Sequence, residues 1–246
     1  MPDLPTPDIR TPDIRTIVET ASTNDDVAAL ARAGAAEGLW LRAGTQSAGR
    51  GRQGRGWVSP PGNLYASTLI RLQRGDPPAP TLALVAAVAL REAVVTFGGD
   101  ALIKWPNDLL IAGAKLSGIL LERHDDAVVI GFGVNLAHHP VDLDRAATSL
   151  AGVTGSAPPP DVFLPVLAES VARWTGRWRA EGLAPIRAGW LAGAHPPGTA
   201  LAARLPDGGT IEGLFDGLDE AGALRLRLAD GRAHVIHAAD IFLIAD

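Results

Sequence analysis

The sequence predicts an α+β fold, in which a mixed β-sheet is backed by helices and a small β-barrel follows at the C-terminus. Three observations support this. Strand-like and helical runs are interspersed up to residue 180, a long amphipathic helix covers residues 161–180, and short strand-like runs separated by turns follow residue 196. We predict a disordered tail at 1–16, a larger domain at 17–195 and a small β-domain at 196–246.

The N-terminal elements follow from simple patterns. Residues 6–10 repeat as residues 11–15, and prolines every few positions predict a disordered tail. A helix is expected to begin near Asn24, since apolar residues follow at helical spacing, and residues 39–43 resemble a short buried strand. Residues 44–56, called the glycine-rich loop below, show no apolar period and predict a mobile basic loop.

The remaining elements are predicted in the same way. Residues 82–97 are apolar nearly all round, which indicates a buried helix. Residues 161–180 carry large apolar side chains at helical spacing. Strands are expected at 63–70, 101–105, 116–122 and 127–134, and in the small domain at 201–205, 210–214, 223–228 and 233–236.

Composition excludes several classes of protein. The net charge of −5 and pI of about 5.7 argue against broad electrostatic binding to nucleic acid. Without cysteine there is no disulfide framework and no thiolate nucleophile. The start of the chain lacks a signal-peptide pattern, and residues 82–97 are too short to span a bilayer and include Arg91 and Glu92. We therefore expect a cytoplasmic protein that does not bind membranes.

Lysine is rare in this chain. Among 22 lysines and arginines, only Lys104 and Lys115 are lysines. Arginine is a broad planar fork, whereas lysine is a compact charge on a thin stem. In an arginine-biased sequence, a lysine therefore indicates a position where arginine does not suit, and both lysines lie in segments that look chemical.

The glycine-rich loop contains a G-x-G-x-x-G pattern, from Gly49 to Gly54. A dinucleotide-binding turn should continue into a helix, but Pro60, Pro61 and Gly62 follow shortly, so that interpretation fails on context. Three arginines on a glycine-rich backbone suit a polyanion. A flexible solvated loop and an RNA-binding segment are the alternatives, and acidic net charge counts against the second.

The segment Lys104-Trp105-Pro106-Asn107-Asp108 groups an ammonium, an amide and a carboxylate at a strand end. Such a group can hold a phosphate through its lysine and a magnesium ion through its carboxylate. The same residues can instead form a strand-to-turn junction in which Asn107 and Asp108 cap their own backbone. Taken alone, the segment leaves both interpretations open.

Three further segments attract attention. Lys115 stands at the entrance of an apolar strand in which Gly118 permits close approach of a ligand, although an exposed edge lysine would look similar. Ser22-Thr23-Asn24 offers partners for a small polar heterocycle, or caps a helix. Gly131-Phe132-Gly133-Val134-Asn135 ends a strand where backbone could meet a flat ring and an amide could bind an adenine edge, or forms a tight turn.

Together these segments resemble the biotin protein ligases. Ser-Thr-Asn, the loop Gln46-Ser-Ala-Gly-Arg-Gly-Arg-Gln-Gly-Arg-Gly-Trp57, Lys-Trp-Pro-Asn-Asp, Lys-Leu-Ser-Gly-Ile-Leu-Leu-Glu and Gly-Phe-Gly-Val-Asn occur in the family's order and spacing. The resemblance runs from about residue 16 to the end. It implies a class II synthetase-like catalytic domain and an SH3-like C-terminal domain.

The resemblance also implies a reaction and a set of site residues. ATP and biotin would form biotinyl-5′-AMP and pyrophosphate, with Mg²⁺, and biotin would pass to a lysine of a biotin carboxyl carrier domain. Lys115, Arg52 and Arg50 would be catalytic, and Asp108 would bind the metal. Ser22, Thr23, Asn24, Gln46, Lys115 and Gly118 would bind biotin, while Arg50, Gly51, Arg52, Trp57, Lys104, Asn107 and Asn135 would bind the nucleotide.

Two alternatives remain beside this expectation. A lipoate–protein ligase shares the catalytic fold, but its arginine-serine-glycine-glycine loop is missing. A non-catalytic biotin or nucleotide sensor would not need Lys115 and Arg52.

Some members of the family carry a DNA-binding helix-turn-helix. The roughly twenty residues before Ser22 leave no room for one, so we expect a stand-alone ligase that does not bind DNA. A homodimer is one option for its assembly.

Overall fold

The computed structural model describes residues 12–141 and 146–244. Within them, a seven-stranded sheet has the order β1-β2-β3-β7-β6-β5-β4, in which β1 and β2 run parallel and the other neighbours antiparallel. The predicted mixed sheet is therefore confirmed. Its strands are β1 (Asp13–Thr20), β2 (Leu39–Gln46), β3 (Leu64–Arg71), β4 (Leu102–Lys104), β5 (Asp108–Ile111), β6 (Ala114–His124) and β7 (Ala127–Val134).

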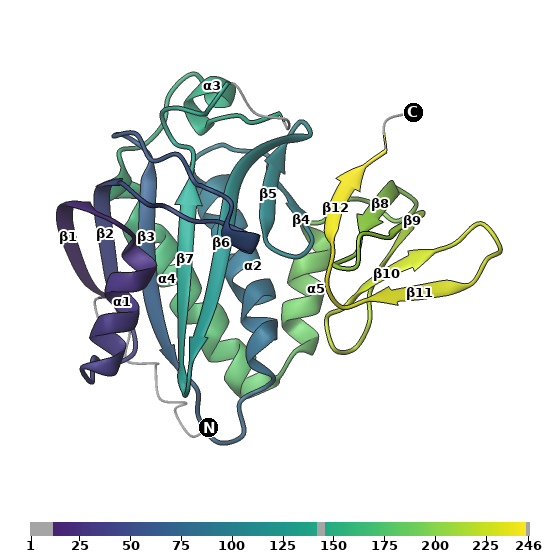
Figure 1. The fold of residues 1–246 in the computed structure, drawn as a ribbon, viewed down its shortest axis with the longest axis horizontal. Coiled ribbons are helices and arrows are strands. Elements are labelled where there is room, and N and C mark those ends of the chain that lie inside the picture. Colours follow the sequence, from purple (N-terminus) through teal and green to yellow (C-terminus); the bar gives the residue numbers. More distant parts are fainter. Residues whose placement is uncertain (1–11, 142–145, 245–246) are drawn as a thin grey trace, which may run out of the picture.

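Helices cover both faces of this sheet (Figure 1). Helix α1 packs on β2, β3 and β7 from one side, while α2 and α4 pack on the other and α5 packs against them. The helices are α1 (Thr23–Arg32), α2 (Leu82–Thr96), α3 (Leu150–Thr154), α4 (Pro160–Glu181) and α5 (Ala184–Ala192), with short 3-10 turns at Arg52–Gly54 and Ala79–Thr81. The predicted helices near 24, at 82–97 and at 161–180 are thus confirmed, and α3 and α5 are additions.

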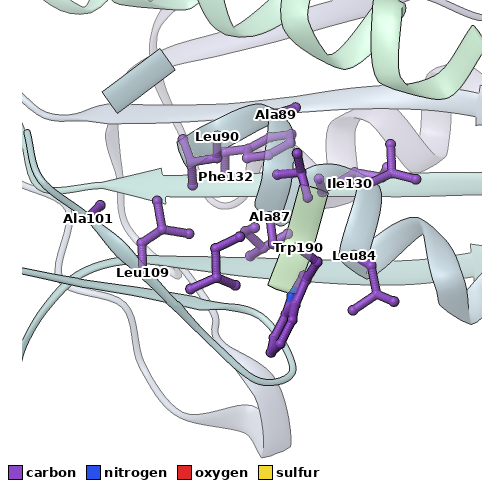
Figure 2. Close-up of a cluster of buried hydrophobic side chains, with 14 of the residues drawn as sticks. Leu84, Ala87, Ala89, Leu90, Ala101, Leu109, Ile130, Phe132 and Trp190 are labelled. Atoms are coloured by element: carbon purple, nitrogen blue, oxygen red, sulfur yellow. The ribbon is translucent and has the colours of Figure 1, made fainter. Parts of the chain in front are cut away.

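Helix α2 forms the centre of the core. Figure 2 shows its Leu84, Ala87 and Leu90 among the side chains that surround Phe132 of β7 and Trp190 of α5. Residues Ala79–Thr96 are long and apolar enough to cross a membrane by length and composition, but 61% of this window is buried inside the protein. Burial against the sheet explains the apolar composition of α2, as a buried core helix requires.

The C-terminal part forms a five-stranded antiparallel sheet in the order β11-β10-β9-β8-β12. Its core is continuous with that of the larger sheet, and the rings of Trp190 and Phe215 lie 6.3 Å apart. The strands are β8 (Ala200–Arg204), β9 (Thr210–Leu218), β10 (Leu224–Arg227), β11 (Ala233–Ile236) and β12 (Asp240–Leu243). The four predicted strands are confirmed, and β12 is an addition.

Two sequence predictions need correction. The tail at 1–16 was predicted to be disordered, but residues 13–16 belong to β1, which pairs with β2 from Asp13↔Leu39 onward. Residues 1–11 lie outside the described residues. Residues 13–16 can form a strand because Pro12 lies just before it, where a proline costs no ladder hydrogen bond. The β-branched residues that follow Pro12 also favour a strand. Strand β5 was also not predicted, because the turn-forming Pro106 and Asn107 immediately before it concealed a short strand.

Candidate active site

A pocket of about 370 Å³ lies where the start of α1, the end of β2, the glycine-rich loop, strands β4 to β7 and strand β12 come together. The structure brings almost the whole predicted site into it. The predicted residues that line it are Ser22, Thr23, Asn24, Gln46, Arg50, Gly51, Arg52, Trp57, Lys104, Asn107, Asp108, Lys115 and Gly118. Asn135 is the predicted residue that does not.

One end of the pocket is a buried hydrogen-bond network at the start of α1. Ser67 Oγ donates to Asn24 Oδ1 at 2.6 Å, and it lies 2.7 Å from Thr23 Oγ1. Thr23 Oγ1 also lies 3.2 Å from Gln46 Oε1, so this hydroxyl joins Ser67 of β3 to Gln46 of β2. Gln46 Oε1 accepts from the backbone N–H of Thr23 at 2.9 Å. The network fixes the orientation of two amide side chains that face the pocket.

The same network separates the two interpretations of Ser22-Thr23-Asn24. Ser22 is the N-cap residue of α1, but its side chain makes no capping hydrogen bond, and it is 3% exposed. Asn24 donates from Nδ2 to Glu122 Oε2 at 2.7 Å rather than to its own helix. Side-chain capping therefore does not account for these polar groups, all of which line the pocket.

Sequence reasoning missed three residues of this network. Ser67 and Glu122 hold Asn24, and Gly131 makes room for it, since a Cβ built on Gly131 would lie 2.2 Å from Asn24 Oδ1. Ser67 stands in a strand that is otherwise mostly apolar, which is a usable signal. Glu122 ends the motif that begins at Lys115, but nothing in the sequence links it to Asn24.

The glycine-rich loop is tied to α1 by its first arginine. Arg50 forms a bidentate pair with Asp25, with N–O distances of 2.6 and 2.7 Å, and its Nη2 lies 3.6 Å from Glu122 Oε1. The hydrogen bonds from Arg50 hold the pKa of Asp25 below its ordinary value. Arg50 thus places the loop beside the polar network, and it is engaged with carboxylates rather than directed at an open anion site.

The other two arginines reach across the pocket. Arg52 donates to Asn107 Oδ1 over 3.4 Å, a weak contact that leaves most of its donors for an anion. Arg55 pairs with Asp240 of β12. A bridge between Arg50 and Gly56 and the 3-10 turn Arg52–Gly54 give the loop a defined path within the structure. This turn explains the glycine at position 54, whose φ of 70° is a left-handed value that glycine adopts readily.

Trp57 covers two glycines of the sheet. Gly118 of β6 pairs with Gly133 of β7, and a Cβ on Gly133 would lie 2.6 Å from the Trp57 ring. A Cβ on Gly118 would lie 3.3 Å from the same ring. Of the two glycines predicted to meet a flat ring, Gly133 meets one that belongs to the protein, whereas Gly131 faces Asn24. The Trp57 ring forms the flat wall of the pocket beside Lys115.

A carboxylate stands between the two lysines. Lys115 Nζ donates to Asp108 Oδ1 at 2.7 Å, and Lys104 Nζ lies 3.5 Å from Asp108 Oδ2. Lys104 also donates to the carbonyl of Ile241 at 3.0 Å. Lys115 Nζ lies 5.6 Å from the centre of the Trp57 ring, within cation–π range. Two ammonium groups are thus concentrated at one end of the pocket, where an incoming anion can replace Asp108.

These contacts do not fit Asp108 as part of a magnesium site built by the protein. Both of its oxygens face ammonium groups, which oppose a divalent cation at the same oxygens. In the part of the chain that the structure describes, no group of three or more His, Cys, Asp or Glu side chains is arranged to hold a metal ion.

Asn135 supports the pocket from behind. It is 3% exposed, and its Nδ2 donates to the carbonyl of Thr148 at 3.0 Å. Its backbone carbonyl accepts from Leu150. The neighbouring Ala147 does line the pocket. The amide of Asn135 thus fixes a segment of the pocket wall, while its expected contact with adenine stays a prediction.

His195 marks the junction between the two sheets. Burial lowers the pKa of His195 below its ordinary value, and the positive charge of Lys104 lowers it further. Among the described residues its Nε2 is buried without a hydrogen-bond partner. The folded protein thus favours neutral His195, while the unfolded chain takes up a proton below about pH 6.5. Stability from this residue is present at higher pH and is lost as pH falls.

We therefore expect His195→Gln to reduce the loss of Tm between about pH 8 and about pH 5. Thermal unfolding of the variant and the parent across this range measures the effect. The exposed His237 provides the matched control, because His237→Gln should leave the pH profile of the parent unchanged. Identical profiles for His195→Gln and the parent would contradict the burial argument.

Comparisons with known proteins place this mixed sheet and its cationic pocket among the protein ligases that use biotin or lipoate. Residues 20–135 match the biotin/lipoate A/B protein ligase family, and residues 202–244 match the biotin protein ligase C-terminal domain. A biotin–[acetyl-CoA-carboxylase] ligase of Paracoccus denitrificans is 43% identical over 92% of this chain and 98% of its own. The chain belongs to the biotin protein ligase family.

Solved structures support the same family. The biotin protein ligase of Aquifex aeolicus in complex with biotin and ATP superposes with a TM-score of 0.85, at 24% identity, over 94% of this chain and 99% of its own. The Leishmania major enzyme in complex with biotinyl-5-AMP has a TM-score of 0.67 at 29% identity, over 92% and 99%. The first of these shows the fold, which matches the expected catalytic domain with its C-terminal β-domain.

Proposed function

We propose that the pocket holds biotin against the polar network of α1 and the phosphates of ATP against Arg52, Lys104 and Lys115. As a biotin protein ligase, the protein joins the two substrates into biotinyl-5′-AMP and releases pyrophosphate. It then transfers the biotinyl group to a lysine of the biotin carboxyl carrier domain of a carboxylase. The observation that carries the assignment is Lys115, which lines one pocket together with the polar network and the glycine-rich loop.

The first step forms one bond and breaks another. A carboxylate oxygen of biotin attacks the α-phosphorus of ATP, and pyrophosphate leaves with the electron pair of the broken bond. Negative charge builds on the α-phosphoryl oxygens, so cations placed there in advance give the largest stabilisation. Lys115 exchanges Asp108 for the substrate anions, and Arg52 approaches the same phosphate from the loop.

The second step uses the carbonyl carbon of the mixed anhydride. The neutral amine of the acceptor lysine attacks this carbon, AMP leaves, and the amine loses a proton as the amide forms. Until the acceptor arrives, water must be kept from the anhydride. The glycine-rich loop and Trp57 cover the phosphate end of the pocket, which suits this protective role.

Neither DNA nor lipoate has a place in this proposal. The net charge of −5 offers no broad positive field to a duplex. The amides of Asn24 and Gln46, held by the buried network, suit the ureido ring of biotin, whereas the dithiolane ring of lipoate offers them no matching donors. Specificity for biotin therefore resides at the α1 end of the pocket.

A pyrophosphate-release assay tests the proposed function. With ATP and biotin the protein should release pyrophosphate and form biotinyl-5′-AMP, and a biotin carboxyl carrier domain should then become labelled. Lipoate in place of biotin should support a rate at least about 10²-fold lower, since its dithiolane ring makes no hydrogen bond with the amides of the polar network. Equal rates with both acids would contradict the assignment of the polar network to biotin.

The role of Arg52 leads to a separate prediction. Arg52→Ala should weaken retention of biotinyl-5′-AMP by about 10-fold or more, because a charge-assisted contact with the phosphate is lost. Biotin affinity should change little, since Arg52 contacts Asn107 and not the polar network. Calorimetry with biotin and with a stable adenylate analogue measures both. Equal losses for the two ligands would rule out a specific phosphate role.

A further inference from the structure

The C-terminal sheet contacts the pocket at three points on one side. Asp240 of β12 pairs with Arg55 of the glycine-rich loop, and the carbonyl of Ile241 accepts from Lys104. The carbonyl of Gly222 accepts from Trp105 Nε1 at 3.3 Å. Asp240 and Ile241 themselves line the pocket. The small domain is therefore part of the pocket wall at the phosphate end.

The glycine-rich loop is consequently held from two directions. Arg50 binds Asp25 at the start of α1, and Arg55 binds Asp240 five residues later along the loop. Arg52 lies between these two attachments and faces Asn107. The first attachment belongs to the domain that holds biotin, whereas the second belongs to the C-terminal sheet. The loop that carries Arg52 is therefore attached to both domains.

The environment of Asp240 favours a firm attachment. Its side chain is 13% exposed, whereas the side chain of Arg55 is 47% exposed. A carboxylate that is mostly buried stays in place, and the flexible arginine comes to it. A second cavity of about 610 Å³ adjoins the loop along the domain junction and shares Arg52, Trp105 and Asn107 with the pocket. The Arg55–Asp240 pair thus holds the loop at a place where a cavity, rather than packed side chains, adjoins it.

We infer that Asp240 is a positioning residue, which holds the glycine-rich loop closed over the adenylate from the C-terminal domain through Arg55. This inference rests on the proposed function for its substrate, but the loop attachment itself does not. Asp240 need not touch biotin or ATP to act. Its loss should leave the first turnover nearly intact and should speed the escape or hydrolysis of biotinyl-5′-AMP before transfer.

The test combines Asp240→Asn with a matched control. Asp230→Asn removes another aspartate–arginine pair of the C-terminal domain, Asp230–Arg232, which does not line the pocket. In the absence of acceptor, Asp240→Asn should raise steady AMP release by about five- to tenfold, in line with the loss of a partly buried charge-assisted pair. The first-turnover rate of adenylate formation should stay within about twofold, and Asp230→Asn should behave like the parent.

A charge exchange distinguishes positioning from direct phosphate binding. The double variant Arg55→Asp/Asp240→Arg restores the attachment with reversed polarity, so AMP release should return towards the parental rate. If Arg55 instead bound phosphate, the double variant would lose ATP affinity and Asp240→Asn alone would have no effect. Either unchanged release in Asp240→Asn or failure of the exchange would overturn the inference.

Limited trypsin digestion tests the attachment without reference to activity. The loop contains Arg50, Arg52 and Arg55, so release from Asp240 should speed cleavage there by about fivefold in Asp240→Asn. Melting curves check that the variant is folded. A parent protein that fails to release pyrophosphate with biotin would refute the proposed function, while this digestion would still decide the inference. Unchanged cleavage in a folded variant would refute the attachment.

Discussion

Lys115→Arg is expected to abolish pyrophosphate release from biotin and ATP, with a loss of about 10³-fold in the first-turnover rate. Both side chains carry the same charge, so the effect must come from shape. Lys115 Nζ sits 2.7 Å from Asp108 Oδ1, and a Cβ on Gly118 would lie only 3.3 Å from it. The broader guanidinium has no room between this glycine, Asp108 and the ring of Trp57.

The control for this substitution is Arg177→Lys on the exposed side of α4, where Arg177 pairs with Glu181. It exchanges the same two residue types far from the pocket lining and should leave the rate unchanged. Quenched-flow measurement of pyrophosphate separates chemistry from product release. Near-normal turnover by Lys115→Arg would show that Lys115 does not lie between carboxylate and phosphate.

Gly131→Ala is expected to raise the KM for biotin by about 10- to 100-fold while it changes the KM for ATP much less. A Cβ at this position would lie 2.2 Å from Asn24 Oδ1, so Asn24 must move. Its hydrogen bonds with Ser67, at 2.6 Å, and Glu122, at 2.7 Å, then break or lengthen. Because these bonds fix the amide that faces the pocket, biotin loses an oriented partner.

Two other glycines make this prediction selective. Gly133→Ala would place a Cβ 2.6 Å from the Trp57 ring, so it should raise the KM for ATP more than the KM for biotin. Gly176→Ala in α4 is the control, because its Cβ would meet nothing within 4 Å among the described residues. Its KM values should match the parent. If Gly131→Ala and Gly133→Ala affected both substrates equally, the division of the pocket into two ends would be wrong.

The sequence predicted a helix or strand well where one pattern of apolar residues extends over many positions. Helices α2 and α4 and strands β3, β6 and β7 fall within a few residues of their predicted ranges. Strand β1 was missed because it begins inside the second of two proline-containing repeats, where the prolines suggested a disordered tail. Strands β5 and β12 are four residues each and depend on neighbouring strands for their stability, which no local pattern reveals.

In the site, too, features carried by the local sequence could be predicted, whereas features that depend on distant residues could not. Residues that contribute their own rare chemistry, such as Lys115, Asn24 and Gln46, could be found from the sequence, and the structure brings them into one pocket. Residues that act on those side chains could not. Asp240 lies 185 positions from Arg55, and only the fold brings the two together. Asn135 was also singled out from the sequence, and the structure places it behind the pocket wall, where its amide donates to the Thr148 carbonyl.

The most direct test of the central claim is an experimental structure of the protein with a non-hydrolysable biotinyl-adenylate analogue. Lys115 Nζ should leave Asp108 and lie within about 3 Å of both the carbonyl oxygen and a phosphate oxygen. The biotin ring should contact Asn24, and Arg52 should approach the phosphate. A bound analogue with Lys115 still paired to Asp108 and remote from the phosphate would contradict the assignment.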